Sequence, residues 1–189
     1  MPKFPVHDVT SAPERSRPIL EQARKALGFV PNLYGVLAES PALLKGYTTL
    51  AAGFEGCSLS AAERQVVLLT TSFENGCDYC MAAHSAIARM QHVPEGIVAA
   101  VRDGATISDP KLEALRGFTR ELVRRRGWVP AADVQTFLDV GYTTEQVLEV
   151  IVGVGLKTLS NYANHLAGTP LDAAFKGHAW SKPALVAAP

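Results

Sequence analysis

The stretch Glu74-Asn-Gly-Cys-Asp-Tyr-Cys-Met-Ala-Ala-His84 holds two thiols, a carboxylate and an imidazole within eleven residues. In a helix that starts near Cys77, Cys77 and Cys80 lie at i and i+3, and His84 follows Cys80 at i+4, so the three share one face. The Asn-Gly pair before Cys77 is typical of a helix end, which places Cys77 close to a helix N-terminus. Unpaired N–H groups there favour thiolate over thiol. The stretch therefore predicts a reactive thiol pair with a nearby base.

Other interpretations of these cysteines stay open. Buried cysteines are usually inert, and an isolated histidine is more often structural than catalytic. We adopt the inert interpretation for Cys57, which stands alone in Gly-Cys-Ser-Leu-Ser. Cys77, Cys80 and His84 could also bind zinc, because Cys-x-x-Cys with a histidine offers three ligands. The chain has no second Cys/His pair at zinc-finger spacing, which argues against a zinc site.

The segments around the motif have helical signals. Ser60-Ala-Ala-Glu63 has the form of a capping box and predicts a helix that begins at Ala61 and leads to the motif. The motif helix itself is expected from Asp78 to about Gln91. The run Val147–Val154 is rich in β-branched residues and could form a strand. We favour a long last helix, because the run lacks alternation and follows an N-cap at Thr143.

The whole pattern predicts an all-α protein, a single helical domain of about eight helices without a confident strand. Residues 1–18 contain Pro2, Pro5, Pro13 and Pro18 and are expected to form an extended N-terminal arm, on the body or on a neighbouring subunit. Residues 19–175 are expected to form the domain, and 176–189 a C-terminal tail.

Composition excludes several classes of function. Eighteen Lys and Arg residues balance eighteen Asp and Glu residues, so nothing electrostatic favours nucleic acid. Although 48% of the residues are hydrophobic, no run is long enough to span a bilayer, and the N-terminus lacks an apolar signal core. We therefore expect a cytoplasmic protein without a membrane partner. In a reducing compartment a Cys-x-x-Cys pair is more often catalytic than structural.

Around Asn75-Gly-Cys-Asp-Tyr-Cys-Met-Ala-Ala-His84 the chain closely resembles the alkylhydroperoxidase D-like branch of the carboxymuconolactone decarboxylase family. The phrases Gly28-Phe-Val-Pro-Asn-Leu33 and Ser160-Asn-Tyr-Ala-Asn-His-Leu-Ala-Gly-Thr-Pro170 are similar to its peroxidase-related members. The resemblance implies a helical fold that assembles into homo-oligomers, often trimers or hexamers. It also implies a thiol pair in a pocket near a subunit boundary.

The resemblance further implies roles for the motif residues. Cys80 would attack an organic hydroperoxide, Cys77 would resolve the sulfenic acid as a disulfide, and His84 would serve a proton relay. An external dithiol would reduce the disulfide, and no metal, haem or flavin cofactor is expected. Helix-dipole reasoning alone would instead make Cys77 the more acidic thiol, so this order of the thiols follows the resemblance.

One position departs from the family pattern. The family has a glutamate twelve residues before the first cysteine, where this chain has Gln65, which cannot ionise. The nearest carboxylates are Glu63, which the capping box already explains, and Glu74, which is our candidate for the catalytic carboxylate. Tyr79, Tyr162 and His165 are further candidates for lining the pocket.

The sequence thus predicts a thiol-dependent hydroperoxidase or disulfide oxidoreductase with Cys77, Cys80, His84 and Glu74 as its catalytic residues. Two alternatives remain beside the zinc site. A decarboxylase or lactone-processing enzyme of the same family would keep its activity without the cysteines. A non-enzymatic redox sensor would oxidise without appreciable turnover.

Overall fold

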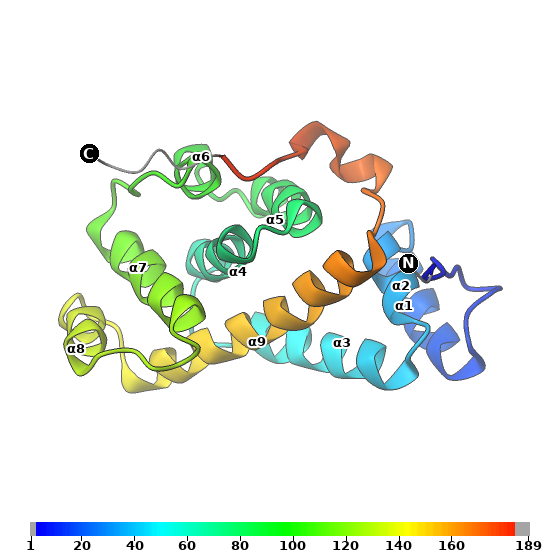
Figure 1. Cartoon of the computed structure of the whole chain (residues 1–189), viewed down its shortest axis with the longest axis horizontal. Helices are drawn as coiled ribbons and strands as arrows, with labels where there is room; N and C mark the ends of the chain where they lie inside the picture. Colours follow the sequence, from blue (N-terminus) through cyan, green and yellow to red (C-terminus); the bar gives the residue numbers. More distant parts are fainter. Residues whose placement is uncertain (1–2, 184–189) are drawn as a thin grey trace.

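The computed structural model describes residues 3–183, which form nine α-helices and two short 3₁₀ helices and contain no β-strand (Figure 1). In chain order these are η1 Glu14–Ser16, α1 Arg17–Leu27, α2 Asn32–Leu37, α3 Pro41–Glu55, α4 Ala61–Asn75, α5 Asp78–Met90, α6 Glu95–Asp103, α7 Pro110–Arg124, α8 Ala131–Asp139, α9 Thr144–Ala167 and η2 Ala173–His178. The all-α prediction is confirmed, and the segment 147–154 is helical.

Helix α4 is the centre of the fold. It contacts α5, α6, α7 and α9, and nearly every side chain from Gln65 to Phe73 is buried. Its N-terminus has the predicted capping box, in which Ser60 and Glu63 satisfy each other's backbone N–H groups. A helix with apolar residues on all sides is stable only when it is surrounded, as α4 is here.

The turn between α4 and α5 places Cys77. Gly76 has φ +67°, a left-handed conformation that glycine adopts without strain. The backbone N–H of Cys77 donates to Ser72 O at 2.9 Å, and Cys77 is the N-cap residue of α5. The predicted position of Cys77 at a helix N-terminus is therefore confirmed.

Helix α9 crosses the molecule beside α3 and against α4 (Figure 1). A Cβ atom on Gly153 would lie 2.7 Å from both the Phe54 ring and a Val67 methyl group, so only glycine permits this approach. The close crossing brings the second half of α9 against the N-terminus of α5.

Both ends of the described chain pack against helices. The backbone N–H of His7 donates to Gly35 O in α2 at 3.1 Å. At the other end η2 contacts α5, and the indole N–H of Trp180 donates to Arg102 O at 2.9 Å. The expected arm thus includes η1 and the start of α1, and the expected tail begins inside η2. Residues 1, 2 and 184–189 of these segments lie outside the described residues.

None of the helices within residues 3–183 combines the length and apolar content needed to cross a bilayer.

Candidate active site

Cys77 and Cys80 lie together where α5 begins. Both are free thiols, each only 1% exposed, and the side-chain amide of Asn164 lies within hydrogen-bond reach of both sulfurs. The structure thus brings together the two thiols that the sequence singled out.

A polar stripe on α9 faces this thiol pair. The stripe consists of Lys157, Ser160 and Asn164, which continue the buried positions Val150 and Gly153 at helical spacing. Ser160 Oγ lies 3.7 Å from Cys80 Sγ, and Asn164 Nδ2 lies 3.3 Å from the same sulfur. Asn164 Nδ2 is also 3.7 Å from Cys77 Sγ, so its amide bridges both thiols.

The surroundings of the two thiols shift their pKa values in opposite directions. Burial alone would raise the pKa of Cys80, but the Cys77 hydrogen bond, the Lys157 charge and Ser160 hold it well below its usual range. The hydrogen bond to Cys80 raises the pKa of Cys77, and burial raises it further. Helix-dipole reasoning alone favours the opposite order, and the Lys157 charge together with the hydrogen bonds around Cys80 acts against it.

His84 lies one turn beyond Cys80, and its hydrogen-bond partner is Gln65. His84 Nδ1 is 3.1 Å from Gln65 Oε1, while Gln65 Nε2 donates to Gln91 Oε1 at 3.0 Å. Because Gln65 presents its oxygen, we assign the proton of His84 to Nδ1, which leaves Nε2 as a base. Burial lowers the pKa of His84 well below its usual value, and the Lys157 charge acts in the same direction.

The two candidate carboxylates point to other partners. Glu74 Oε2 lies 2.7 Å from Arg124 Nε in an ion pair between α4 and α7. Glu63 accepts from the backbone N–H of Ser60 at 2.8 Å and lies 3.5 Å from Lys111 Nζ. The structure thus brings Cys77 and Cys80 together but not Glu74.

The additional candidates have different surroundings. Tyr79 donates its hydroxyl to Asp172 at 2.5 Å and accepts the N–H of Leu33, so it joins α5 to α2 and to the segment before η2. His165 is exposed and lines a pocket next to Cys77. Tyr162 is 57% exposed on α9.

A pocket of about 500 Å³ lies next to Cys77, and Cys80 is not part of its wall. Its wall includes Cys77, Tyr79, Asn164, His165, Leu171 and Trp180. The side-chain carbonyl oxygen of Asn164, Oδ1, is buried and has no hydrogen-bond partner within the described chain. An unpaired buried acceptor beside a reactive thiol is suited to a ligand that donates a hydrogen bond.

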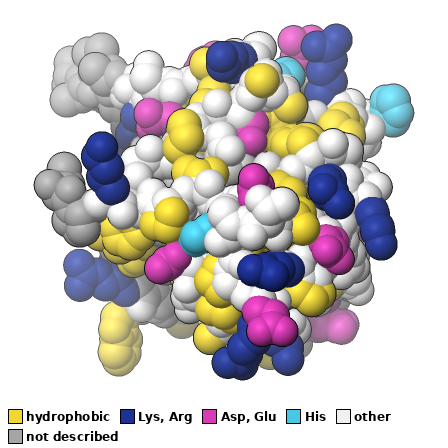
Figure 2. All heavy atoms as spheres, turned by 90° about the vertical axis from the view of Figure 1, so that its right-hand side faces the viewer, with side chains coloured by type: hydrophobic (Ala, Val, Ile, Leu, Met, Phe, Trp, Pro, Cys, Tyr) yellow, Lys and Arg dark blue, Asp and Glu magenta, His cyan; other side chains and the backbone are white. Residues whose placement is uncertain are grey.

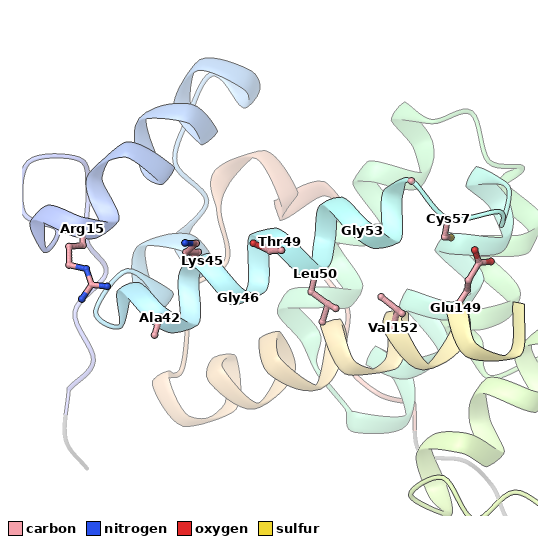
Figure 3. A pocket seen from close by; sticks show the side chains of 11 residues that line it. Arg15, Ala42, Lys45, Gly46, Thr49, Leu50, Gly53, Cys57, Glu149 and Val152 are labelled. Carbon is pink, nitrogen blue, oxygen red and sulfur yellow. The ribbon is translucent and has the colours of Figure 1, made fainter. Parts of the chain in front are cut away.

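A wider groove of about 930 Å³ lies elsewhere, between α3 and α9 (Figure 3). Cys57 and Glu149 lie next to each other at one end of this groove. Burial raises the pKa of Cys57, and the Glu149 carboxylate raises it further. This groove holds neither thiol of the pair.

Three residues of the site, Lys157, Ser160 and Asn164, were missed as functional candidates. Lys157 is the only charged residue between Val150 and Asn164, and it falls in phase with the buried positions of the last helix. A lysine on the buried face of an apolar helix is the signal that could have identified it.

Charged side chains of both signs are mixed on one face of the molecule (Figure 2). On the face in Figure 2 basic and acidic side chains alternate, with hydrophobic side chains between them. Within residues 3–183, no three His, Cys, Asp or Glu side chains converge as metal ligands would.

The fold and the site define a class: an all-α protein with a buried Cys-x-x-Cys pair at the start of one helix and a histidine one turn later. Residues 41–121, which include both thiols and His84, match the model of the carboxymuconolactone decarboxylase family. The resemblance drawn from the sequence is confirmed. No curated protein matches the chain.

Solved structures share the fold over nearly the whole chain. One is an alkylhydroperoxidase core structure, a peroxidase-related protein from Ralstonia eutropha JMP134, with TM-score 0.82 and 24% identity, covering 92% of this chain and 93% of that chain. A peroxidase-related protein from Silicibacter sp. TM1040 has TM-score 0.78 and 19% identity, covering 93% of each chain. A cysteine-to-alanine variant of the debrominase Bmp8, in complex with 2,3,4-tribromopyrrole, has TM-score 0.77 and 16% identity, covering 94% of this chain and 95% of that chain. These similarities establish the alkylhydroperoxidase D-like fold alone.

Proposed function

We propose that the protein is a thiol-dependent hydroperoxidase, in which Cys80 is the peroxidatic thiol and Cys77 the resolving thiol. The observation that carries this proposal is the buried pair itself. Asn164 Nδ2 lies 3.3 Å from Cys80 Sγ and 3.7 Å from Cys77 Sγ, and the charge of Lys157 lowers the pKa of Cys80. These contacts favour the thiolate at Cys80, and the thiolate is the form that attacks peroxides.

The proposed cycle has three steps. The Cys80 thiolate attacks the terminal oxygen of a hydroperoxide, which breaks the O–O bond, forms a sulfenic acid and, with one proton, releases an alcohol. The Cys77 thiol then displaces water from the sulfenic acid and closes a Cys77–Cys80 disulfide. An external dithiol donates two electrons and two protons to restore both thiols.

Our first candidate for the proton transfers of this cycle is His84. His84 is neutral, and its Nε2 is free to accept a proton. Glu74 remains a candidate, although its carboxylate would have to leave Arg124 to reach the thiols. In the resolving step Cys77, whose pKa is raised by its hydrogen bond to Cys80, supplies its own proton.

The pocket next to Cys77 suits an organic hydroperoxide. Leu171 and Trp180 offer apolar surface for the organic part. The unpaired side-chain oxygen Oδ1 of Asn164 can accept a hydrogen bond from the O–H group of a hydroperoxide. A simple ether or alkane has no such donor. The volume of about 500 Å³ admits a molecule of the size that protein ligand pockets usually hold.

We also propose that the protein assembles with copies of itself. Helix α9 exposes an apolar row at helical spacing, in which Leu148 is 64%, Tyr162 57% and Leu166 71% exposed. Such a row supports a contact between subunits, and light scattering would measure the number of copies.

Reductive debromination is a second candidate, supported by the structural similarity to the debrominase. The same thiolate would take bromine from an aromatic substrate as a sulfenyl bromide, and the ring carbon would receive a proton. Cys77 would then displace bromide and close the same disulfide. Decarboxylase activity and non-enzymatic redox sensing remain the alternatives that do not use this cycle.

Steady-state turnover and intact mass test the proposal on wild type, Cys77→Ser and Cys80→Ser. With tert-butyl hydroperoxide and a dithiol, wild type should turn over, and stoichiometric peroxide should remove the mass of two hydrogen atoms. Cys77→Ser should retain one added oxygen on Cys80, and Cys80→Ser should be inactive. A parallel assay for bromide release from a bromopyrrole distinguishes the second candidate.

Three equally inactive proteins, with a wild-type pair that oxidises only slowly, would contradict the proposal. Activity that survives the loss of both cysteines would point to the decarboxylase.

A further inference from the structure

Lys157 is buried without a carboxylate partner. It is 1% exposed, and none of the ion pairs within residues 3–183 includes it. A buried ammonium group costs much free energy unless an anion compensates it. The anion must therefore come from another kind of side chain near α9.

The titratable groups that interact with the charge of Lys157 come from two helices and the N-cap of α5. They are Tyr34 of α2, Cys77, and Cys80 and His84 of α5. Tyr47 of α3 lies close to Cys80 and Ser160. Burial raises the pKa of Tyr34 to about 12 and raises that of Tyr47 as well, so both phenols stay protonated.

Two further neighbours of Lys157 are excluded as its anion. The interaction with Cys80 and burial raise the pKa of Cys77, which favours the thiol, and burial lowers the pKa of His84, which favours the neutral imidazole. The remaining group is Cys80, whose sulfur lies 3.3 Å from Asn164 Nδ2 and 3.7 Å from Ser160 Oγ, on the same stripe of α9 as Lys157. The Asn164 amide donates to this sulfur, which suits an anion. The Ser160 hydroxyl donates to the backbone carbonyls of Leu156 and Lys157.

We propose that Lys157 and Cys80 form a buried ammonium–thiolate pair in the resting protein, in which Lys157 keeps Cys80 ionised. Lys157 is then a positioning residue that acts through the thiolate and does not itself react. The pair includes the thiol on which the proposed function rests, but the pair forms in the resting protein, before any substrate binds.

The pair also affects the redox equilibrium. Closing the Cys77–Cys80 disulfide removes the thiolate and leaves the buried ammonium group without its counter-ion. The oxidised form is therefore destabilised relative to the reduced form, as in dithiols whose reduced form is stabilised by thiolate contacts. Lys157 should thus make the disulfide easier to reduce by an external dithiol.

Thiolate absorbance at 240 nm tests the pair without peroxide. In a Cys57→Ser/Cys77→Ser background, Cys80 is the only thiol, and the serine hydroxyl that replaces the Cys77 thiol can still donate to it. The titration midpoint should lie below the usual thiol value of about 8.5. Lys157→Met, which keeps a long unbranched chain, should raise it by about 1 to 3 pH units. Lys157→Arg, which keeps the charge, should raise it less.

Lys45→Met is the matched control, because Lys45 is exposed on α3 and lines the groove away from the thiols. It should leave the midpoint unchanged. Equilibration with a glutathione buffer gives a second readout, in which Lys157→Met in the wild-type background should shift the pair toward the disulfide. An unchanged midpoint in Lys157→Met would overturn the proposal.

If the Lys157 variants fail to fold, the titration midpoint of Cys80 in the Cys57→Ser/Cys77→Ser protein still tests the proposal. A midpoint at or above about 8.5 would overturn it, because it excludes a stabilised thiolate. The test is independent of the proposed activity. A protein without peroxidase turnover but with an ionised Cys80 would retain the pair and lose only the function.

Discussion

Cys57 and Cys80 both face α9, yet they have opposite surroundings. Cys57 lies beside Glu149 at the end of the wide groove, whereas Cys80 lies beside Lys157 two turns further along the same helix. Burial raises the pKa of each thiol, and in each case it is the largest contribution. The charge on α9 then adds to this effect at Cys57 and opposes it at Cys80.

The comparison shows that exposure alone is a poor guide to the reactivity of a thiol. Cys57 is the more exposed of the two and lines the larger groove. Cys80 is more deeply buried but lies beside an amide N–H donor of Asn164 and the charge of Lys157. Because the thiolate is the nucleophile, we expect the buried thiol to be the reactive one.

Replacing each thiol in turn should give the largest difference between the two sites. Cys80→Ser should lower peroxide turnover by at least about 100-fold, since removal of a nucleophile leaves only background catalysis. Cys57→Ser should leave turnover within about twofold of wild type. The measurement is the steady-state rate with tert-butyl hydroperoxide and a dithiol, and equal losses in both variants would remove the distinction drawn here.

Local signals in the sequence were sufficient for most of the fold. The capping box of Ser60 and Glu63, the glycine at position 76 and the helical period from Thr143 onward act over a few neighbouring residues, and each appears as expected. The position of Cys77 at a helix N-terminus follows from the same local rules.

The acidity of the two thiols could not be predicted in this way. Lys157 and Asn164 lie far beyond Cys80 in the chain, and 84 positions separate Asn164 from Cys80. Glu74 likewise pairs with Arg124, 50 positions away. Helix periodicity predicts which face of α9 is buried but not which other buried face it meets, so the partners of the thiols become visible only in the folded chain.

Low pH should destabilise the folded protein through His84, in the Cys80 region, rather than through the Cys57 groove. His84 is held neutral in the folded state because its pKa is lowered, while the unfolded chain binds a proton near pH 6.5. Below that pH the unfolded state binds more protons, so the free energy of unfolding falls as pH falls. At pH 5.5 the loss should be about 1 kcal/mol relative to neutral pH.

His84→Asn isolates this contribution, because an amide nitrogen can still donate to Gln65 but does not titrate in this range. Urea unfolding at pH 7.5 and 5.5 measures the difference between the parent and the variant. An identical pH dependence in both proteins would show that His84 is not held neutral.

The smallest expected effect concerns the carboxylate beside Cys57. In a Cys77→Ser/Cys80→Ser background, Glu149→Gln should speed alkylation of Cys57 by iodoacetamide about twofold at pH 7.5, since charge interactions at partly exposed sites are weak. The amide oxygen can still accept from Ser58, which now donates to Glu149 from its backbone N–H at 2.7 Å. Glu145→Gln, an exposed carboxylate one turn earlier on α9, should leave the rate unchanged. An increase in Glu149→Gln alone means that the negative charge on α9 lowers the acidity of Cys57, the opposite of the effect proposed for Lys157 at Cys80. No increase would mean that burial alone keeps Cys57 protonated.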